Sequence, residues 1–216
     1  MSTDSPTFAL HPAGPPPPVR MSYEEFLDWH PESGLAEWVN GEAILMPPPP
    51  VRHQHVIRFL SALLSWFVES RDLGTVLFAP VQMRLRASGR EPDILFVSTE
   101  HQDRFRDLYL EGPADLVIEV ISPEGRSRDR VEKFREYQQA GIPEYWIVDP
   151  ARQEAVFYSL GADGAYQPLV VEPDGVIRSR VFAGFWLQVE SLWQEPLPRV
   201  ASVLKALGIT SVALRR

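Results

Sequence analysis

Residues 114 to 150 read ADLVIEVISPEGRSRDRVEKFREYQQAGIPEYWIVDP, and their pattern decides the fold class. The apolar run 115–121 predicts a buried strand, which Ser122-Pro123 ends. The next positions predict a helix over about 127–140, with Gly141 as its C-terminal cap. Residues 144–149 predict another apolar strand. A strand–helix–strand unit of this length favours a right-handed crossover between parallel strands, so we expect a mixed α/β fold.

Two acidic residues interrupt apolar strands. Glu119 lies in the middle of 115–121, and Asp93 follows Pro92 at the start of the apolar run 92–97. An unpaired buried carboxylate is costly, so each needs a reason. Asp93 could cap a strand end, and Glu119 could pair with an arginine. If the two strands are neighbours, the carboxylates instead meet and, with a backbone carbonyl, provide the oxygen ligands that suit Mg²⁺.

Lys133 lies on the helix that follows Glu119. A lysine beside such a metal could position or deprotonate the attacking water, or stabilise charge that develops on phosphorus. Tyr137, one turn later on the same face, could orient the lysine or contact phosphate, although it is also typical of a core edge. Asp129, one turn earlier, could pair with Lys133, and a lysine on a charged helix is usually solvated. The favoured hypothesis is metal-dependent hydrolysis of phosphodiesters.

The N-terminal third predicts a tail and three elements. Residues 1–20 contain four consecutive prolines and predict a disordered, Pro-rich tail, which leaves 21–216 as a single domain. Ser22 and Glu25 have capping-box spacing and predict a helix over 23–29. Asn40-Gly41 predicts a hairpin within 35–46. Apolar residues at intervals of three and four predict a helix over 52–70.

The remaining segments predict strands and turns. Residues 75–85 predict one strand with a bulge or edge position at Pro80, 87–90 a turn, and 101–110 a helical or irregular segment. After Pro150 we expect C-terminal hairpins, with strands at 154–160 and 166–171, a last apolar run at 183–189 and a helix over 198–207. Together, the predicted strands and helices indicate a mixed β-sheet flanked by helices.

Composition excludes several classes of protein. The chain has no cysteine, which excludes a disulfide scaffold and thiolate metal sites. The net charge of −8 argues against a broad, sequence-independent grip on nucleic acid, although it allows a local basic patch. We see no secretory signal and no apolar run that could span a membrane, so we expect a cytoplasmic protein.

Histidines and arginines give weaker signals. His53 and His55 begin the helix 52–70, but an i, i+2 pair does not share a helix face, so surface or hydrogen-bonding roles are favoured and His53 is kept only as a helper. Six arginines could contact phosphates, although acidic neighbours favour solvation for most of them: they stand at 84, 86, 90, 126, 128 and 130. No element for recognising particular bases is evident.

A family resemblance follows from the order of the motifs. Pro92-Asp93, Glu119 and Lys133 resemble the PD-(D/E)XK nuclease superfamily, and the chain is similar over about residues 20–195 to the Uma-two family of restriction-endonuclease-like proteins. The segments that carry the likeness are EWVNGE at 37–42, His53-Gln54, PDILFV at 92–97, LVIEVISP at 116–123, Asp129, Lys133 and Tyr137, and GIPEYWIVDP at 141–150.

The resemblance implies a restriction-endonuclease-like fold and a Mg²⁺-dependent endonuclease acting on DNA, with Mn²⁺ as a substitute. Ile121 stands where the superfamily lysine usually lies, so the family pattern assigns that role to Lys133 on the following helix. It also implies Glu37 as a third metal ligand beside Asp93 and Glu119. Cleavage of two strands would favour a homodimer.

Two alternatives stay open. A catalytically inactive, nuclease-like scaffold for binding or assembly would suit the acidic charge and the missing recognition element. Metal-dependent hydrolysis of another phosphate ester would use the same residues. Metal binding that depends on Asp93 and Glu119 separates the first alternative from an enzyme, and a substrate panel tests the second.

Overall fold

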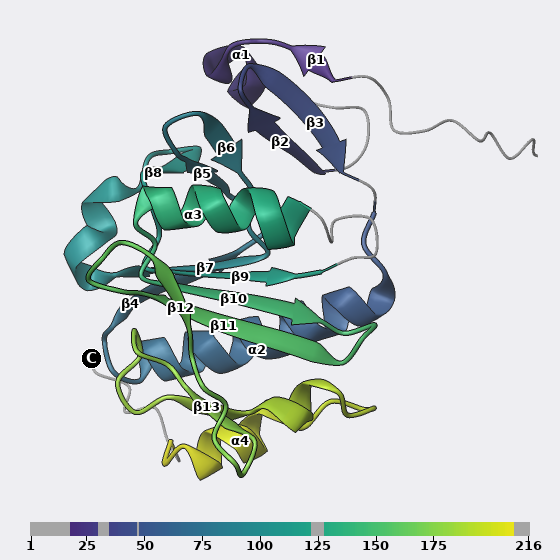
Figure 1. Ribbon diagram of the computed structural model, residues 1–216, viewed down its shortest axis with the longest axis vertical. Coiled ribbons are helices and arrows are strands. Elements are labelled where there is room, and N and C mark those ends of the chain that lie inside the picture. Colours follow the sequence, from purple (N-terminus) through teal and green to yellow (C-terminus); the bar gives the residue numbers. More distant parts are fainter. Residues whose placement is uncertain (1–17, 30–34, 47, 122–127, 210–216) are drawn as a thin grey trace, which may run out of the picture.

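The computed structural model describes residues 18–29, 35–46, 48–121 and 128–209 (Figure 1). The predicted tail therefore lies outside the described residues up to position 17. Val19 and Arg20, which the sequence assigned to that tail, form a short strand, β1 (Val19–Arg20). No helix in the described ranges is long and apolar enough to cross a membrane.

The central sheet has the strand order β12-β11-β10-β9-β7-β4. Its middle strands are β7 (Ile94–Ser98), β9 (Leu116–Val120) and β10 (Glu144–Asp149), and nearly every residue in them is buried. β9 and β10 run parallel, as the crossover predicted, and β7 runs antiparallel to β9. These strands are mostly apolar because both faces of the sheet are covered.

Helix α2 (Val51–Glu69) covers one face of the central sheet, and helix α3 (Phe134–Ala140) lies on the other (Figure 1). The apolar positions of α2 that the periodicity predicted, from Val56 to Phe67, belong to one core cluster with the sheet. A π-helical segment, η2 (Arg128–Lys133), precedes α3, so the helix predicted over 127–140 has two geometries. Gly141 ends it in the left-handed conformation with φ 80°, as predicted.

The second sheet has the order β1-β3-β2-β6-β5-β8 and begins with the predicted hairpin. β2 (Leu35–Val39) and β3 (Glu42–Met46) pair through a turn in which Asn40 has φ 50° and Gly41 has φ 86°. Helix α1 (Tyr23–Asp28) starts with the predicted capping box of Ser22 and Glu25. Both local predictions are confirmed because the signals depend on neighbouring residues alone.

Two predictions for residues 75–90 are wrong. The single strand predicted over 75–85 is two strands in different sheets, β4 (Gly74–Phe78) and β5 (Gln82–Arg84), because Pro80 cannot donate to a ladder and the chain leaves the central sheet there. The turn predicted over 87–90 is strand β6 (Ser88–Arg90), which pairs with β5 and β2. Glycine is uncommon within strands, so Gly89 favoured the prediction of a turn. In the structure, a Cβ atom added at Gly89 would lie 2.4 Å from Tyr23 Cε2. The close approach of the Tyr23 ring therefore favours glycine at this strand position.

The other elements surround these two sheets. The last hairpin and the C-terminal helix share a core cluster with α2, whereas the hairpin before them forms the edge of the central sheet (Figure 1). The remaining bounds are η1 (Thr99–Arg104), β8 (Tyr109–Glu111), β11 (Glu154–Leu160), β12 (Tyr166–Pro168), β13 (Val176–Arg178), β14 (Trp186–Gln188), η3 (Val189–Leu192) and α4 (Val200–Ala206). The predicted mixed sheet with flanking helices and C-terminal hairpins is thus confirmed.

Candidate active site

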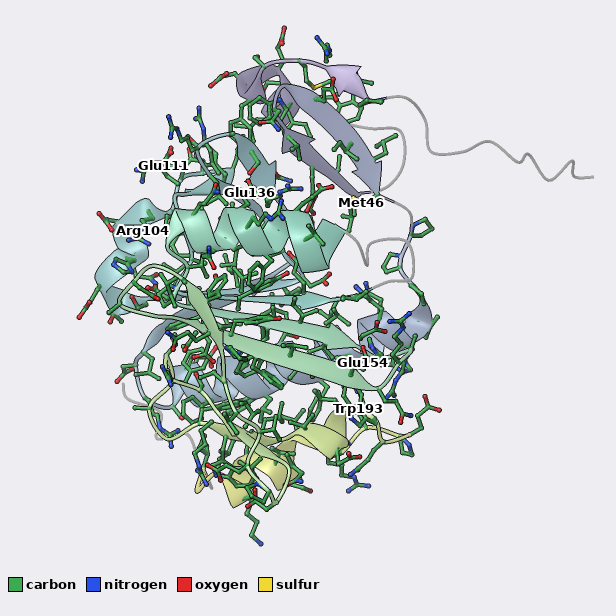
Figure 2. The ribbon with its side chains drawn as sticks, viewed as in Figure 1. Met46, Arg104, Glu111, Glu136, Glu154 and Trp193 are labelled. Atoms are coloured by element: carbon green, nitrogen blue, oxygen red, sulfur yellow. The ribbon has the colours of Figure 1, made fainter. Side chains whose placement is uncertain are left out.

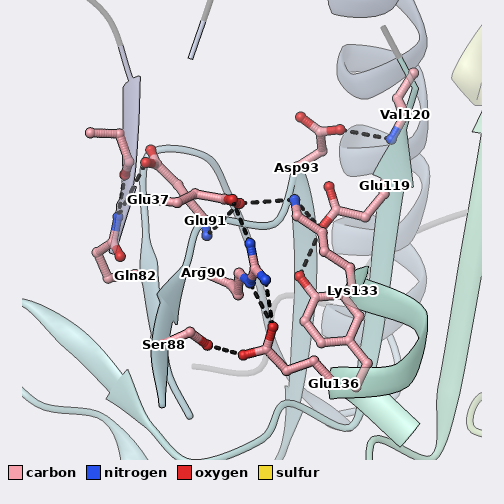
Figure 3. Close-up of polar contacts among 12 residues, drawn as sticks. Glu37, Gln82, Ser88, Arg90, Glu91, Asp93, Glu119, Val120, Lys133 and Glu136 are labelled. Atoms are coloured by element: carbon pink, nitrogen blue, oxygen red, sulfur yellow. Dashed lines mark hydrogen bonds and ion pairs between the residues drawn. The ribbon is translucent and has the colours of Figure 1, made fainter. Parts of the chain in front are cut away.

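Four elements bring the predicted site residues together where the two sheets approach each other. Asp93 directly precedes β7, and because Ile94 pairs with Ile118, Asp93 comes next to the β9 residue Glu119. Glu37 lies on β2 of the second sheet, and Lys133 ends η2 at the start of α3. Figure 3 shows Lys133 between Glu37 and Glu119, with Asp93 beside them.

Lys133 is the central cation of this cluster. Its Nζ lies 2.9 Å from Glu119 Oε1 and 2.9 Å from Glu37 Oε1, and the residue is 2% exposed. It is therefore not the solvated lysine that a charged helix usually carries. Ile121 is buried in the apolar cluster on the α3 side of the sheet, so a helical lysine reaches the point where the strand offers only a hydrocarbon side chain. The side chain of Asp129, the alternative partner, lies outside the described residues.

Tyr137 fixes Glu119 from the next helical turn. Its hydroxyl donates a hydrogen bond of 2.8 Å to Glu119 Oε1. Burial, and secondly the negative charge of Glu119, raises the pKa of Tyr137 well above its ordinary value, so the phenol stays a neutral donor. Glu119 thus has a lysine and a tyrosine among its partners.

Asp93 is held by a backbone amide and a histidine. Val120 N donates to Asp93 Oδ2 at 2.7 Å, and His53 Nε2 lies 3.3 Å from the same oxygen. His53 is buried in the first turn of α2, whereas His55 is exposed. The sequence placed both histidines near the helix start, but only the packing of α2 on the sheet distinguishes the one that reaches Asp93.

Arg90 has a role that the sequence did not indicate. Its guanidinium donates to Glu37 Oε2 at 3.0 Å and to Glu136 Oε2 at 2.7 Å, and Ser88 donates to the other oxygen of Glu136. Glu136 lies on the side of α3 that faces the second sheet (Figure 2). Burial opposes charge on Arg90, but Glu37 and Glu136 outweigh it and raise the arginine pKa. The expected roles of Arg90, a surface turn residue or a phosphate contact, are thus replaced by a buried link between β2 and α3.

Glu91 is a further, partly buried acid that the sequence did not indicate. Gln82 Nε2 donates to its Oε2 at 3.2 Å, and its own amide N donates to Glu37 Oε1 at 3.4 Å. Burial, and then the negative charge of Glu37, raises the pKa of Glu91 to about 7. No sequence signal marks it, because its contacts with Gln82 and Glu37 join residues of separate segments.

These side chains line a cavity of about 330 Å³. Glu37, Glu91, Asp93, Glu119 and Lys133 form its charged part. An apolar part faces them, formed by Leu35, Met46, Pro49, Ile57 and Phe78. The cavity therefore combines hard oxygen donors and an ammonium group with a surface that excludes water.

The carboxylates that line the cavity meet part of what a Mg²⁺ site requires. Asp93 and Glu119 are carboxylates on neighbouring strands that line the same cavity, and Mg²⁺ commonly takes one or two carboxylates and keeps several waters. Within the described residues, no three acidic or histidine side chains are spaced to hold a metal together. Glu37, predicted as the third ligand, contacts Arg90 and Lys133.

The fold is a mixed sheet with flanking helices. Its cleft brings together an aspartate that follows a proline at the start of one strand, a glutamate within a second strand and a lysine. This combination defines a restriction-endonuclease-like protein. The comparisons agree on this class. The chain belongs to the Uma2 (Uma-two) family, described as "Putative restriction endonuclease", whose profile matches residues 23–190.

A solved structure shares the fold. The crystal structure of "a putative nuclease belonging to DUF820" from Anabaena variabilis ATCC 29413 superposes with a TM-score of 0.67. The match has 17% sequence identity and covers 82% of this chain and 98% of that chain. No curated protein matches the sequence.

Proposed function

We propose that this protein is a Mg²⁺-dependent endonuclease that hydrolyses phosphodiester bonds of DNA, with Mn²⁺ as an effective substitute. The observation that carries the proposal is the meeting of Asp93, Glu119 and Lys133 around one cavity, from two strands and a helix. Membership of a family described as restriction endonucleases supports the reaction class and makes DNA the first substrate to test.

Asp93 and Glu119 are the residues that would hold the metal, and Glu37 remains the third candidate. Bound Mg²⁺ would polarise a phosphoryl oxygen, promote formation of hydroxide and stabilise the leaving oxygen. The protein's contribution is to keep both carboxylates oriented, since His53 and Val120 N contact Asp93 while Tyr137 contacts Glu119. Such outer partners typically change metal affinity about 10- to 100-fold.

Lys133 is the candidate for the residue that acts on the attacking water or on the phosphoryl group. Its ammonium can orient the attacking water or neutralise charge that develops on the phosphoryl oxygens. Glu37 shares its two oxygens between Lys133 and Arg90, so it fixes the ammonium from the side opposite Glu119. Cleavage of both strands would need two such sites, which favours a homodimer.

Plasmid cleavage tests the proposal. With Mg²⁺, we expect the parent protein to nick or linearise supercoiled DNA and Glu119→Ala to abolish this while the circular dichroism spectrum stays unchanged. Glu100→Ala, which removes an exposed acid, is the matched control and should keep full activity. Undiminished cleavage by Glu119→Ala would refute the assignment.

A scaffold function is the second candidate, because Lys133 already contacts two carboxylates and no three described side chains form a metal cluster. Calorimetry with Mn²⁺ separates the two. An enzyme of the proposed kind binds Mn²⁺ in a manner that Asp93→Asn or Glu119→Gln weakens, whereas a scaffold shows no such binding. If metal binds but DNA stays intact, a panel of other phosphate esters becomes the next test.

A further inference from the structure

A second hollow lies beside the candidate active site. It is a groove of about 430 Å³ between the end of α1 and strands β2 and β5. Leu35 and Glu91 line both the groove and the active-site cavity, so these two side chains form the partition between them. The groove and the active-site cavity are therefore direct neighbours.

The walls of the groove suit a flat aromatic ring. They are mostly apolar, and Phe26 and Trp29 contribute two aromatic rings whose centroids lie 6.2 Å apart. Leu108, a further lining residue, is 61% exposed. Pockets that bind small organic groups combine such walls with a few polar atoms that fix orientation.

Two buried oxygens provide those polar atoms. Within the described residues, Glu91 Oε1 and Gln82 Oε1 have no hydrogen-bond partner, although both residues line the groove. The opposite atoms of the same groups are engaged, because Gln82 Nε2 donates to Glu91 Oε2 at 3.2 Å and to Ala36 O at 3.1 Å. Figure 3 shows the Glu91 side chain turned toward Gln82 and away from Asp93 and Glu119. Buried acceptors without partners are rare, so an occupant that donates hydrogen bonds here would remove a cost.

We propose that this groove binds one unpaired nucleobase that carries an exocyclic amino group, beside the phosphate that is cleaved in the cavity. The base would stack on the aromatic wall and donate its amino hydrogens to Glu91, the residue type that accepts from cytosine N4 in direct readout. The inference rests on the proposed nuclease function, and it supplies the base contact for which the sequence shows no motif.

Fluorescence anisotropy with labelled oligothymidylate tests the proposal, with Ca²⁺ replacing Mg²⁺ to prevent cleavage. One central thymidine is replaced by cytidine, adenosine or guanosine, each of which adds an amino group. We expect these three probes to bind the parent protein about 5- to 100-fold more tightly than oligothymidylate. Glu91→Met, which keeps the length of the side chain and removes both acceptor oxygens, should remove the difference between probes. Trp29→Leu should weaken all probes alike, and Trp66→Leu, which changes an exposed tryptophan outside the groove, should leave every affinity unchanged.

The outcomes separate this proposal from the function on which it rests. If the protein cleaves the plasmid but binds all probes with equal affinity, the proposal of a base-binding groove is wrong and the proposed nuclease function stands. No cleavage and no oligonucleotide binding overturn both. A preference that survives in Glu91→Met also overturns the proposal. Binding of an arginine-rich peptide in place of oligonucleotides overturns it in favour of a protein partner.

Discussion

Replacing Arg90 by methionine should destabilise the protein strongly. Arg90 is 2% exposed, and its guanidinium contacts Glu37 and Glu136 at 3.0 and 2.7 Å. Methionine fills a similar space without charge, so the loss is electrostatic rather than a cavity effect. Removing one partner of a buried ion pair costs about 3–5 kcal/mol, because the remaining charge stays buried without compensation.

The loss of stability in Arg90→Met should lie toward the lower end of that range, because both carboxylates keep other partners. Glu37 is fully buried but keeps Lys133 at 2.9 Å, and the Glu136 side chain is 22% exposed and keeps its contact with Ser88. Each carboxylate therefore retains part of its stabilisation, and we expect a loss of about 3 kcal/mol in the free energy of unfolding. Adding Glu136→Gln to Arg90→Met should recover some of this loss, because one uncompensated charge disappears.

Urea unfolding followed by circular dichroism measures the effect. Arg178→Met is the matched control, since it breaks the Arg178–Glu172 pair, whose side chains are 57% and 40% exposed. Surface pairs contribute little, so this control should stay close to the parent protein. The denaturant dependence should be the same for all variants, which confirms that stability alone has changed. If Arg90→Met costs no more than Arg178→Met, the reasoning about the buried link is wrong.

Two further predictions concern Tyr137 and Glu144. Tyr137→Phe removes the hydroxyl that donates to Glu119, so calorimetry should show Mn²⁺ affinity about 10-fold lower with an unchanged number of sites; unchanged affinity would contradict this role. Burial raises the pKa of Glu144, against hydrogen bonds from Val181, Trp146, Arg180 and Ser179. A raised pKa in the folded state means that the carboxyl contributes most below its ordinary pKa and that the contribution is lost as pH rises through the folded value. Unfolding experiments over a pH series should therefore show parent stability falling with pH relative to Glu144→Gln, and parallel curves would refute this.

The sequence predicts those parts of the fold and site whose signals are local. The turn at Asn40-Gly41 and the capping box of Ser22 depend on a few adjacent residues, and both form as predicted. Glu119 and Asp93 stood out because a carboxylate conflicts with the apolar strand around it. The antiparallel pairing of β7 with β9 then brings these two strands together, which is the condition under which the sequence expected the carboxylates to meet.

The remaining cluster residues depend on contacts between distant segments. Arg90 and Glu136 are separated by 46 positions, and each belongs to a segment in which a charged residue is ordinary. His53 and Asp93 meet only because α2 packs beside the start of β7. No periodicity or motif in one segment encodes such a contact, so sequence reasoning that proceeds segment by segment assigns these residues to the surface.

The charges around the cavity indicate which of the three predicted metal ligands most needs an added cation. Glu37 contacts both Arg90 and Lys133, and Glu119 contacts Lys133. Asp93 has a backbone amide and a histidine as its described partners, and neither carries a permanent charge. Its side chain is 16% exposed, so water compensates the carboxylate only in part. A divalent ion would therefore stabilise Asp93 more than Glu37, and Asp93→Asn should weaken Mn²⁺ binding more than Glu37→Gln does.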